Sequence, residues 1–266
     1  MLYQSQDALV SSRNAEYAPP YHYGGLLSDK PLTPTVSQGL ARRLSKEWLL
    51  HTIIVSASPR GGIVGWENYQ TAMFTSHALD LSGVYGAVWQ RAFDDKQHNS
   101  IRKARRSGAS VRKNKPVQAV ASFYRLYSIA SGRWKNPHLE PEVFFARLLS
   151  TDEPSVSLWL AAKHGLDIAG IIVANNAKDT ADYVAGASDA NYWKYCPNNL
   201  LLSFAIEDAC VRGFTEFDFL PSGGICSVER FKESFGAARV QVPEYWLRGR
   251  LPSLKSRLMA GCRLMR

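Results

Sequence analysis

The order of the elements expected in the second half of the chain constrains its fold more than any other feature. Over residues 117–248, hydrophobic residues recur with helical and strand periods in the order helix, helix, three strands, helix, strand, helix, strand. Helices placed between strands in this way cover the faces of a sheet, and 266 residues are enough to bury a substantial core. The pattern predicts an α+β (α/β) fold with a mixed sheet flanked by helices.

The expected elements are bounded by residues that commonly start or end them. In the second half, helices are expected at residues 117–131, 141–149, 200–212 and 227–235, and strands at 155–162, 167–174, 181–188, 216–220 and 239–248. In the first half, a loop-like start to residue 25 precedes a helix from residue 35, strands at 51–58 and within 69–81, and one long helix over 84–107. Gly108 is expected to end that long helix.

Residues 216–236 combine a short strand, a glycine-bearing turn and an amphipathic helix. Val228, Phe231 and Phe235 lie on one face of that helix, and Lys232, one turn after Val228, borders the same face. An ammonium beside an apolar wall, just past a turn of backbone amides, could stabilise developing negative charge. A structural lysine that packs its aliphatic stem on a buried helix face has the same spacing. Periodicity alone leaves both interpretations open.

The positive charge of the chain is concentrated in two places. Residues 98–115 hold seven basic side chains and residues 248–266 hold six, with no acidic residue in either stretch. Without them the chain has 19 basic against 23 acidic residues, so the net charge of +9 is local. Each stretch is either a surface for an anionic partner or a solvated surface. The apolar stripe among the cations of residues 251–266 suits a short helix on anionic lipid, or a basic tail.

Cysteine spacing and hydropathy indicate the compartment. The four cysteines form no CxxC pair and no zinc-ligand spacing, which favours a reduced, cytoplasmic protein without a metal site. The N-terminal segment is too polar for a signal peptide, and no run approaches the roughly 18 apolar residues of a membrane span. We therefore expect a cytoplasmic protein that could contact the inner face of a membrane through residues 251–266.

Short motifs spread over residues 17–248 carry a family resemblance. They are Tyr23-Gly24-Gly25, Ile101-Arg102-Lys103-Ala104, Tyr124 with Arg133, Ala169-Gly170, Ala187-Ser188, Pro197-Asn198-Asn199-Leu200-Leu201, Gly213, Asp218-Phe219, Phe231-Lys232 and Gly236-Ala237. With the element order, they resemble the GNAT acyltransferase fold, and in particular the FemAB-related branch, which carries two GNAT-like lobes in tandem. The resemblance implies a partial N-terminal lobe over residues 1–108, because little sequence precedes the Tyr23 turn, a complete lobe over 109–250 and a basic tail over 251–266.

The resemblance also implies a function. FemAB-like proteins move an acyl or aminoacyl group, in some cases from aminoacyl-tRNA, onto an amine of a cell-envelope, peptidoglycan or polysaccharide precursor or a related small molecule. The co-substrate is then aminoacyl-tRNA or acyl-CoA, and no resident cofactor is expected. Two alternatives stay open: an N-acyltransferase that uses acyl-CoA or an acyl carrier, and a non-catalytic GNAT-like lobe that binds nucleic acid or an envelope assembly.

The resemblance implies that Lys232 stabilises the oxyanion or binds donor phosphate. Asp218, at the end of an expected central strand, is the candidate base, although it could equally be an ordered carboxylate that accepts backbone amides. The further residues expected to bind donor or substrate are Arg102, Lys103, Arg133, Tyr192, Trp193, Asn199, Ser222, Phe231 and Tyr23.

The loop at residues 189–199 has no glycine, whereas CoA-using GNAT enzymes generally carry a glycine-rich turn there. A standard CoA site is therefore not expected. Tyr192 and Trp193 could stack on unpaired bases of a tRNA acceptor end, or pack as a lid.

Overall fold

The structure, a computed structural model, describes residues 3–5, 14–16, 33–47, 52–56, 66, 69–114, 117–133, 139–150, 155–175 and 179–248. The chain divides into two compact units. The first comprises Met1–Ser76, Pro221–Gly223 and Val240–Arg266, and the second comprises His77–Leu220 and Gly224–Arg239.

The first unit contains a small sheet with one helix. Its elements are β1 (Tyr3–Ser5), β2 (Asn14–Glu16), α1 (Pro34–Glu47), β3 (Thr52–Ser56), the start of β4 (Gln70–Asp80) and most of β10 (Ala238–Arg248). The strand order is β1-β2-β3-β10-β4, and β10 pairs antiparallel with β3. Trp66 is fully buried, donates from Nε1 to the Ser37 carbonyl at 2.9 Å and meets Tyr245 edge to face. Strands β1 and β2 lie in the segment expected to be loop-like.

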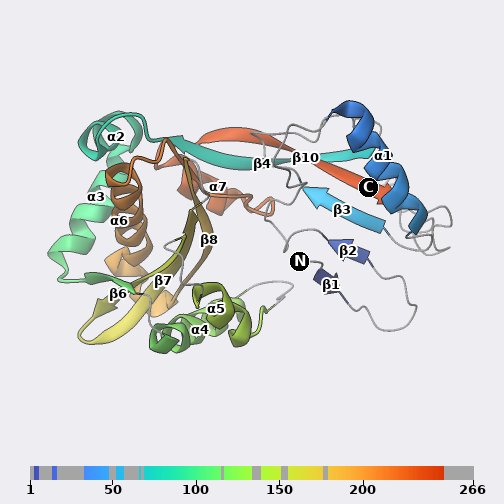
Figure 1. Cartoon of the computed structure of the whole chain (residues 1–266). Coiled ribbons are helices and arrows are strands. Elements are labelled where there is room, and N and C mark those ends of the chain that lie inside the picture. Colours follow the sequence, from blue (N-terminus) through green and yellow to red (C-terminus); the bar gives the residue numbers. More distant parts are fainter. Residues whose placement is uncertain are drawn as a thin grey trace. The chain divides into compact units, whose positions relative to one another are not determined.

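The second unit contains a larger sheet with helices on both faces. Its strands follow the order β4-β9-β8-β7-β6-β5 and comprise the end of β4, β5 (Ser110–Asn114), β6 (Val156–Lys163), β7 (Leu166–Asn175), β8 (Thr180–Ser188) and β9 (Glu216–Asp218). Helices α3 (Asp95–Arg106) and α6 (Pro197–Val211) cover one face, and α4 (Val117–Ser131) and α5 (Glu142–Leu149) cover the other (Figure 1). The predicted α+β fold with a helix-flanked mixed sheet is confirmed.

Two hydrophobic cores follow from this layering. The core on the α3 and α6 face includes Ile171, Leu201 and Phe217, and the core on the α4 and α5 face includes Phe123 and Phe145. Strands β6 and β7 are buried along most of their length because both of their faces carry a core. This explains why their residues read as continuous apolar runs.

The prediction of a single helix over residues 84–107 is wrong. The chain forms α2 (Tyr85–Ala92) and then α3, because Phe93 is extended and Asp94 caps the second helix. The Asp94 carboxylate accepts from the Gln97 amide at 2.6 Å, which satisfies one of the free N–H groups of the first turn. The structure also contains β5, which was not predicted because its strand residues lie within the basic run.

The two compact units do not coincide with the two predicted lobes. Residues 77–108, expected in the first lobe, belong to the second unit, because the end of β4 pairs with β9 and α3 packs on α6. The division into GNAT-like lobes itself stays a prediction.

Strands β8 and β9 are parallel neighbours that pair along all of β9 but only at the beginning of β8. The register runs from Thr180 opposite Glu216 to Asp182 opposite Asp218. Strand β8 then continues to Ser188, whereas β9 ends, and Leu220 turns the chain with a positive φ of 58°. Strand β8 therefore extends past the carboxyl end of β9, and the carboxyl ends of strands are where ligands commonly bind in open α/β sheets.

Candidate functional site

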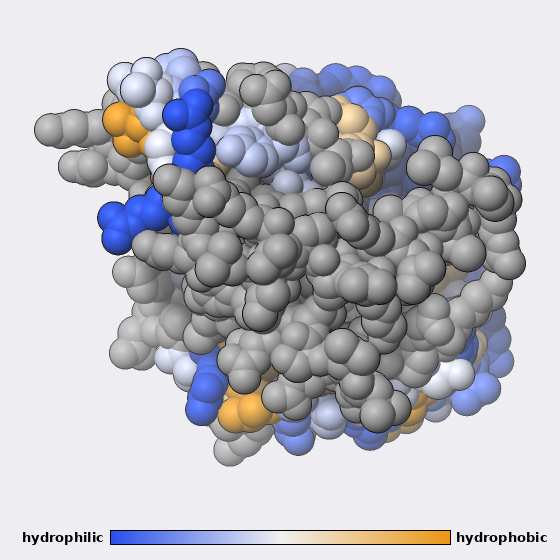
Figure 2. Space-filling model, turned by 90° about the vertical axis from the view of Figure 1, so that its right-hand side faces the viewer, coloured by the Kyte–Doolittle hydropathy of each residue, from blue (hydrophilic) through white to orange (hydrophobic). Residues whose placement is uncertain are grey.

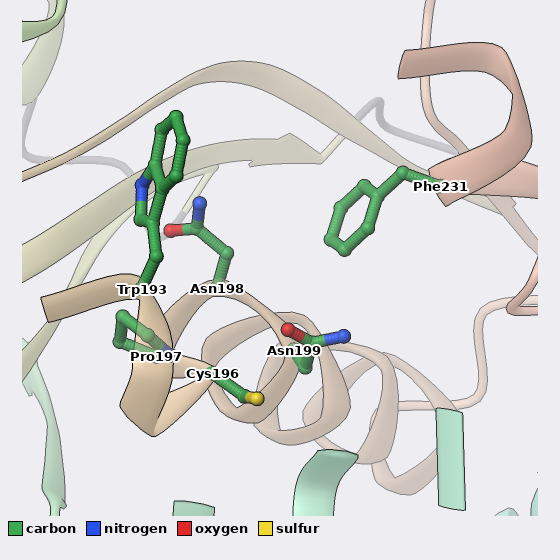
Figure 3. Close-up of a pocket in the computed structure, with 6 residues that line it drawn as sticks. All are labelled: Trp193, Cys196, Pro197, Asn198, Asn199 and Phe231. Carbon is green, nitrogen blue, oxygen red and sulfur yellow. The ribbon is translucent and has the colours of Figure 1, made fainter. Parts of the chain in front are cut away.

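A pocket of about 170 Å³ lies at the N-terminal end of α6 (Figure 3). Its lining residues are Trp193, Cys196, Pro197, Asn198, Asn199 and Phe231. Phe231 comes from α7 (Cys226–Glu233) and faces the first turn of α6 across the opening. The structure thus brings together three of the residues expected to bind the donor, namely Trp193, Asn199 and Phe231.

The local sequence builds the pocket floor by ending one helix and starting another. The 3-10 helix η2 (Ala190–Tyr195) ends at Cys196, which adopts a left-handed conformation with φ 52° and is also the N-cap position of α6. Pro197 is the first residue of α6, a position where its fixed φ and missing N–H are tolerated. Helix α6 therefore begins three residues before the expected start at residue 200.

The start of α6 is suited to negative charge. The first N–H groups of a helix have no acceptor within the helix, and the helix dipole adds a partial positive charge there. The first turn of α6 contains no acidic residue that would compensate it. A phosphate, a carboxylate or an oxyanion at this end of the pocket would be stabilised.

The side chains of the pocket are fixed through Ser188, the last residue of β8. The Ser188 hydroxyl accepts from Trp193 Nε1 at 2.9 Å and from Asn198 Nδ2 at 3.1 Å. Arg133 donates to the Ser188 carbonyl at 2.9 Å, and its guanidinium lies 5.1 Å from the centre of the Trp193 ring. Arg133 therefore helps to fix the orientation of Trp193 in the pocket wall.

A second polar contact ties three helices together below the pocket. Asn199 Nδ2 donates to Gln97 Oε1 of α3 at 2.9 Å, and the Ser234 hydroxyl after α7 donates to the same oxygen at 3.2 Å. Asn198 Oδ1 and Gln97 Nε2 are buried atoms without a hydrogen-bond partner among the described residues. The Asn198 oxygen is thus an acceptor at the pocket that a ligand N–H could satisfy.

Lys232 does not line the pocket but is buried on the other side of α7. It is 2% exposed, and its Nζ donates to the Leu220 carbonyl at 2.5 Å. Burial lowers the pKa of Lys232 to about 8, although the nearby carboxylates of Asp218 and Glu229 act in the opposite direction. The sequence placed Lys232 at the edge of the apolar face of the helix. In the structure its side chain is fully enclosed.

Asp218 holds the same turn from the opposite side. Its carboxylate is fully buried and accepts from the Leu220 amide at 2.7 Å. Lys232 and Asp218 thus bind the two backbone groups of one left-handed residue, and neither appears among the lining residues of the pocket. This contact agrees with the alternative role of Asp218, that of an ordered carboxylate that accepts backbone amides. The catalytic role of both residues stays a prediction.

His77, which was not predicted as a site residue, lies beside this buried pair. His77 is fully buried, and its Nε2 is 3.6 Å from Oε1 of Glu233, which also accepts from Arg239 at 2.6 Å. Burial and the charge of Lys232 lower the pKa of His77, so the neutral ring is favoured although Glu233 opposes this. No periodic pattern distinguishes such a histidine from an ordinary strand residue.

The remaining predicted residues do not gather at the pocket. Arg102 and Lys103 are exposed on α3, and Tyr192 packs near Tyr195 in η2. Ser222 is buried in the first unit. Tyr23, like the basic tail over residues 251–266, lies outside the described residues.

Within the described part of the chain, no three His, Cys, Asp or Glu side chains are placed to hold a metal ion. Nor does any described helix combine the length and apolarity needed to cross a membrane. On the face shown in Figure 2, the described residues are mostly hydrophilic, and hydrophobic ones lie singly or in small groups. Contact with a membrane stays a prediction.

The sequence of this chain matches the model of a known protein family. The sequence model described as an acetyltransferase (GNAT) domain matches residues 95–233, more than half of the chain. No curated protein sequence matches the chain. The matched region contains every residue that lines the pocket, as well as Lys232 and Asp218.

Solved structures share the fold at low sequence identity. FemX is 11% identical, with a TM-score of 0.64 over 91% of this chain and 83% of FemX. L-PGS from Bacillus licheniformis is 12% identical, with a TM-score of 0.61 over 99% and 85%. The C-terminal domain of a putative lysylphosphatidylglycerol synthetase from Agrobacterium fabrum is 14% identical, with a TM-score of 0.57 over 93% and 81%. These likenesses show a FemX-like version of the GNAT fold.

Proposed function

The chain belongs to the GNAT acetyltransferase family, and on that premise we propose that it transfers an aminoacyl group from aminoacyl-tRNA to an amine. The acceptor is an amine of a cell-envelope, peptidoglycan or polysaccharide precursor, or of a related small molecule. One observation carries the proposal: the pocket at the start of α6 joins helix N–H groups, an amide oxygen and two aromatic walls beside the end of β8, which extends past β9.

The construction of the pocket favours a tRNA end over CoA. Cys196 makes the left-handed turn before α6 without a glycine, so side chains occupy the space where a pyrophosphate needs close backbone approach. Trp193 and Phe231 present aromatic rings on either side of the opening, and such rings stack on unpaired bases. The fold likeness to FemX and to a putative lysylphosphatidylglycerol synthetase, whose product by name carries a lysyl group, supports an aminoacyl donor.

Helix α3 supplies a surface for the rest of a polyanionic donor. Five exposed cations lie on this helix, Lys96, Arg102, Lys103, Arg105 and Arg106. The same helix reaches the pocket through the hydrogen bond between Gln97 and Asn199. A phosphate backbone along α3 would therefore lead its acyl end toward the first turn of α6.

In the proposed reaction the neutral amine of the acceptor attacks the ester carbon of the donor. A nitrogen–carbon bond forms, the bond from that carbon to the donor oxygen breaks, and the amine proton passes to the departing oxygen. The N-terminal amides of α6 stabilise negative charge at the pocket, as preorganised donors do. We assign to Lys232 and Asp218 the positioning of the Leu220 turn, which precedes α7 and Phe231. The direct catalytic roles expected from the resemblance are the competing prediction.

The donor is identified by incubating the purified protein with candidate amines and either charged tRNA or acyl-CoA. We expect a mass increase of one aminoacyl residue on the acceptor, which RNase treatment of the tRNA abolishes. Turnover with acyl-CoA that is insensitive to RNase would contradict the tRNA donor. The name of the matching family, acetyltransferase, favours this second candidate, so both donors belong in the experiment.

Charge reversal on α3 tests the proposed path of the donor. Arg102→Glu is expected to weaken tRNA binding about tenfold and to lower the slope of log Kd against log salt by about one. Arg147→Glu, an exposed arginine on α5, is the matched control and leaves both unchanged. Salt-sensitive RNA binding without transfer to any amine would instead support a non-catalytic binding lobe.

A further inference from the structure

Strand β8 contains a bulge that places two unusual residues on the same face of the sheet. Tyr183 pairs with Val173 of β7 and Ala185 pairs with Ile172, so Val184 is an extra residue. Gly186 pairs with Ile171, and both Val173 and Ile171 belong to the core on the α3 and α6 face. Tyr183 and Gly186 therefore point to that face although they are three residues apart, which regular alternation does not allow.

The side chain of Tyr183 occupies the space above Gly186. A Cβ atom at residue 186 would overlap the Tyr183 phenol oxygen and lie 2.7 Å from its Cζ. The backbone of Gly186 does not have a positive φ, so its conformation alone does not require glycine. Residue 186 must be a glycine because the Tyr183 hydroxyl occupies the position of a Cβ atom.

This hydroxyl points along β8 toward the pocket. Ser188 follows Gly186 by two residues on the same face, at a spacing of about 7 Å along a strand. The Ser188 hydroxyl holds Trp193 and Asn198 of the pocket wall. The Tyr183 ring packs near Phe219, and contacts through Phe235 continue this aromatic series to Phe231 on the opposite wall.

No hydrogen-bond partner of the Tyr183 phenol is found among the described residues, although the ring is only partly buried. Burial raises the pKa of Tyr183 to about 12, so the hydroxyl keeps its proton in any ordinary assay buffer. The hydroxyl is therefore a hydrogen-bond donor that is available to a ligand acceptor.

We propose that Tyr183 is a catalytic residue whose hydroxyl, which lies over Gly186 two residues before Ser188, donates a hydrogen bond to the acyl carbonyl oxygen of a donor bound in the pocket. This inference rests on the proposed function. When the acceptor nitrogen bonds to the acyl carbon, the electron pair of the C=O bond moves to that oxygen, and the phenol hydrogen bond strengthens without proton transfer. The pair returns to the carbon–oxygen bond as the donor oxygen departs with the amine proton.

Tyr183→Phe removes one oxygen and keeps the ring that packs near Phe219. We expect kcat for transfer to fall about 10²–10³-fold, as for other single oxyanion donors, with KM for the donor changed by less than about threefold. The urea midpoint is expected to stay at the wild-type value. Tyr124→Phe, a partly buried tyrosine on the opposite face of the sheet, is the matched control and should keep full activity.

Two stable analogues of aminoacyl-adenosine provide a readout apart from turnover. A planar amide should bind wild type and Tyr183→Phe alike, whereas a tetrahedral phosphonate should lose about 10²-fold in affinity only in the variant. If the wild type transfers but Tyr183→Phe keeps its kcat and its phosphonate affinity, the inference is overturned and the proposed function stands. A wild type that neither transfers nor binds either analogue overturns the proposed function, and the role of Tyr183 with it.

Discussion

Phe231 and Lys232 are neighbours on α7, yet they belong to two regions with opposite character. Phe231 faces an open pocket whose polar groups are neutral: an asparagine oxygen, an indole, and the amides of a helix start. Lys232 belongs to an enclosed cluster in which the charged groups Lys232 and Asp218 hold the Leu220 turn. The formal charges of this region are therefore enclosed and hold a backbone turn, whereas the accessible pocket offers only neutral, oriented dipoles to a ligand.

The largest expected effect is on stability and comes from the enclosed cluster. Lys232→Ala leaves the Leu220 carbonyl without its donor and removes the buried cation that the Asp218 carboxylate attracts, so we expect a loss of about 3–5 kcal/mol in the free energy of unfolding. Phe231→Ala, at a partly buried position, should cost only about 1–2 kcal/mol. Urea unfolding of both variants measures the contrast. Equal losses would remove the distinction between the two regions.

The pH dependence of stability is a second test of whether Lys232 is enclosed. The pKa of Lys232 falls from 10.5 to about 8 on folding, so the unfolded chain binds more protons between these values. Wild-type stability should therefore rise from pH 8 to pH 10.5 relative to Lys232→Met, by up to about 3 kcal/mol. The difference between the two urea-unfolding free energies at pH 7.5 and pH 10 isolates this residue. Parallel pH curves would show that Lys232 is not enclosed.

A charge placed in the open pocket should affect donor binding and not reduce stability, the opposite of a change at Lys232. Asn199→Asp adds a negative charge to the first turns of α6, which leaves the fold as stable as before or more stable by about 0.3–1 kcal/mol. Donor binding should weaken by about 2 kcal/mol, because the carboxylate opposes an anionic ligand. Gln97 can rotate its unpartnered Nε2 toward the new carboxylate, which keeps the contact between helices. Unchanged donor affinity, measured by calorimetry, would argue against an anion at this position.

Much of the fold could be predicted because hydrophobic periodicity reports local structure. The expected strands at residues 155–162, 167–174 and 181–188 agree with β6, β7 and β8 to within one residue. Prediction failed where a single residue decides where a helix begins. The cap formed by Asp94 divides an otherwise continuous helical pattern, and Pro197 starts α6 earlier than the apolar residues indicate.

The candidate site was predictable only in part. Trp193, Asn199 and Phe231 were named from motif positions, and the fold brings them together. The enclosure of Lys232 depends on a left-handed Leu220, a conformation that no residue type at this position indicates. The contact between Tyr183 and Gly186 depends on a one-residue bulge, and a strand pattern does not show register.

The most direct test of the account is a crystal structure of the protein with the planar amide analogue of aminoacyl-adenosine. We predict that the analogue lies between Trp193 and Phe231, with its acyl oxygen within hydrogen-bond distance of the Tyr183 hydroxyl and Lys232 still bound to the Leu220 carbonyl. An analogue held by the Lys232 ammonium, or bound away from the start of α6, would contradict the account.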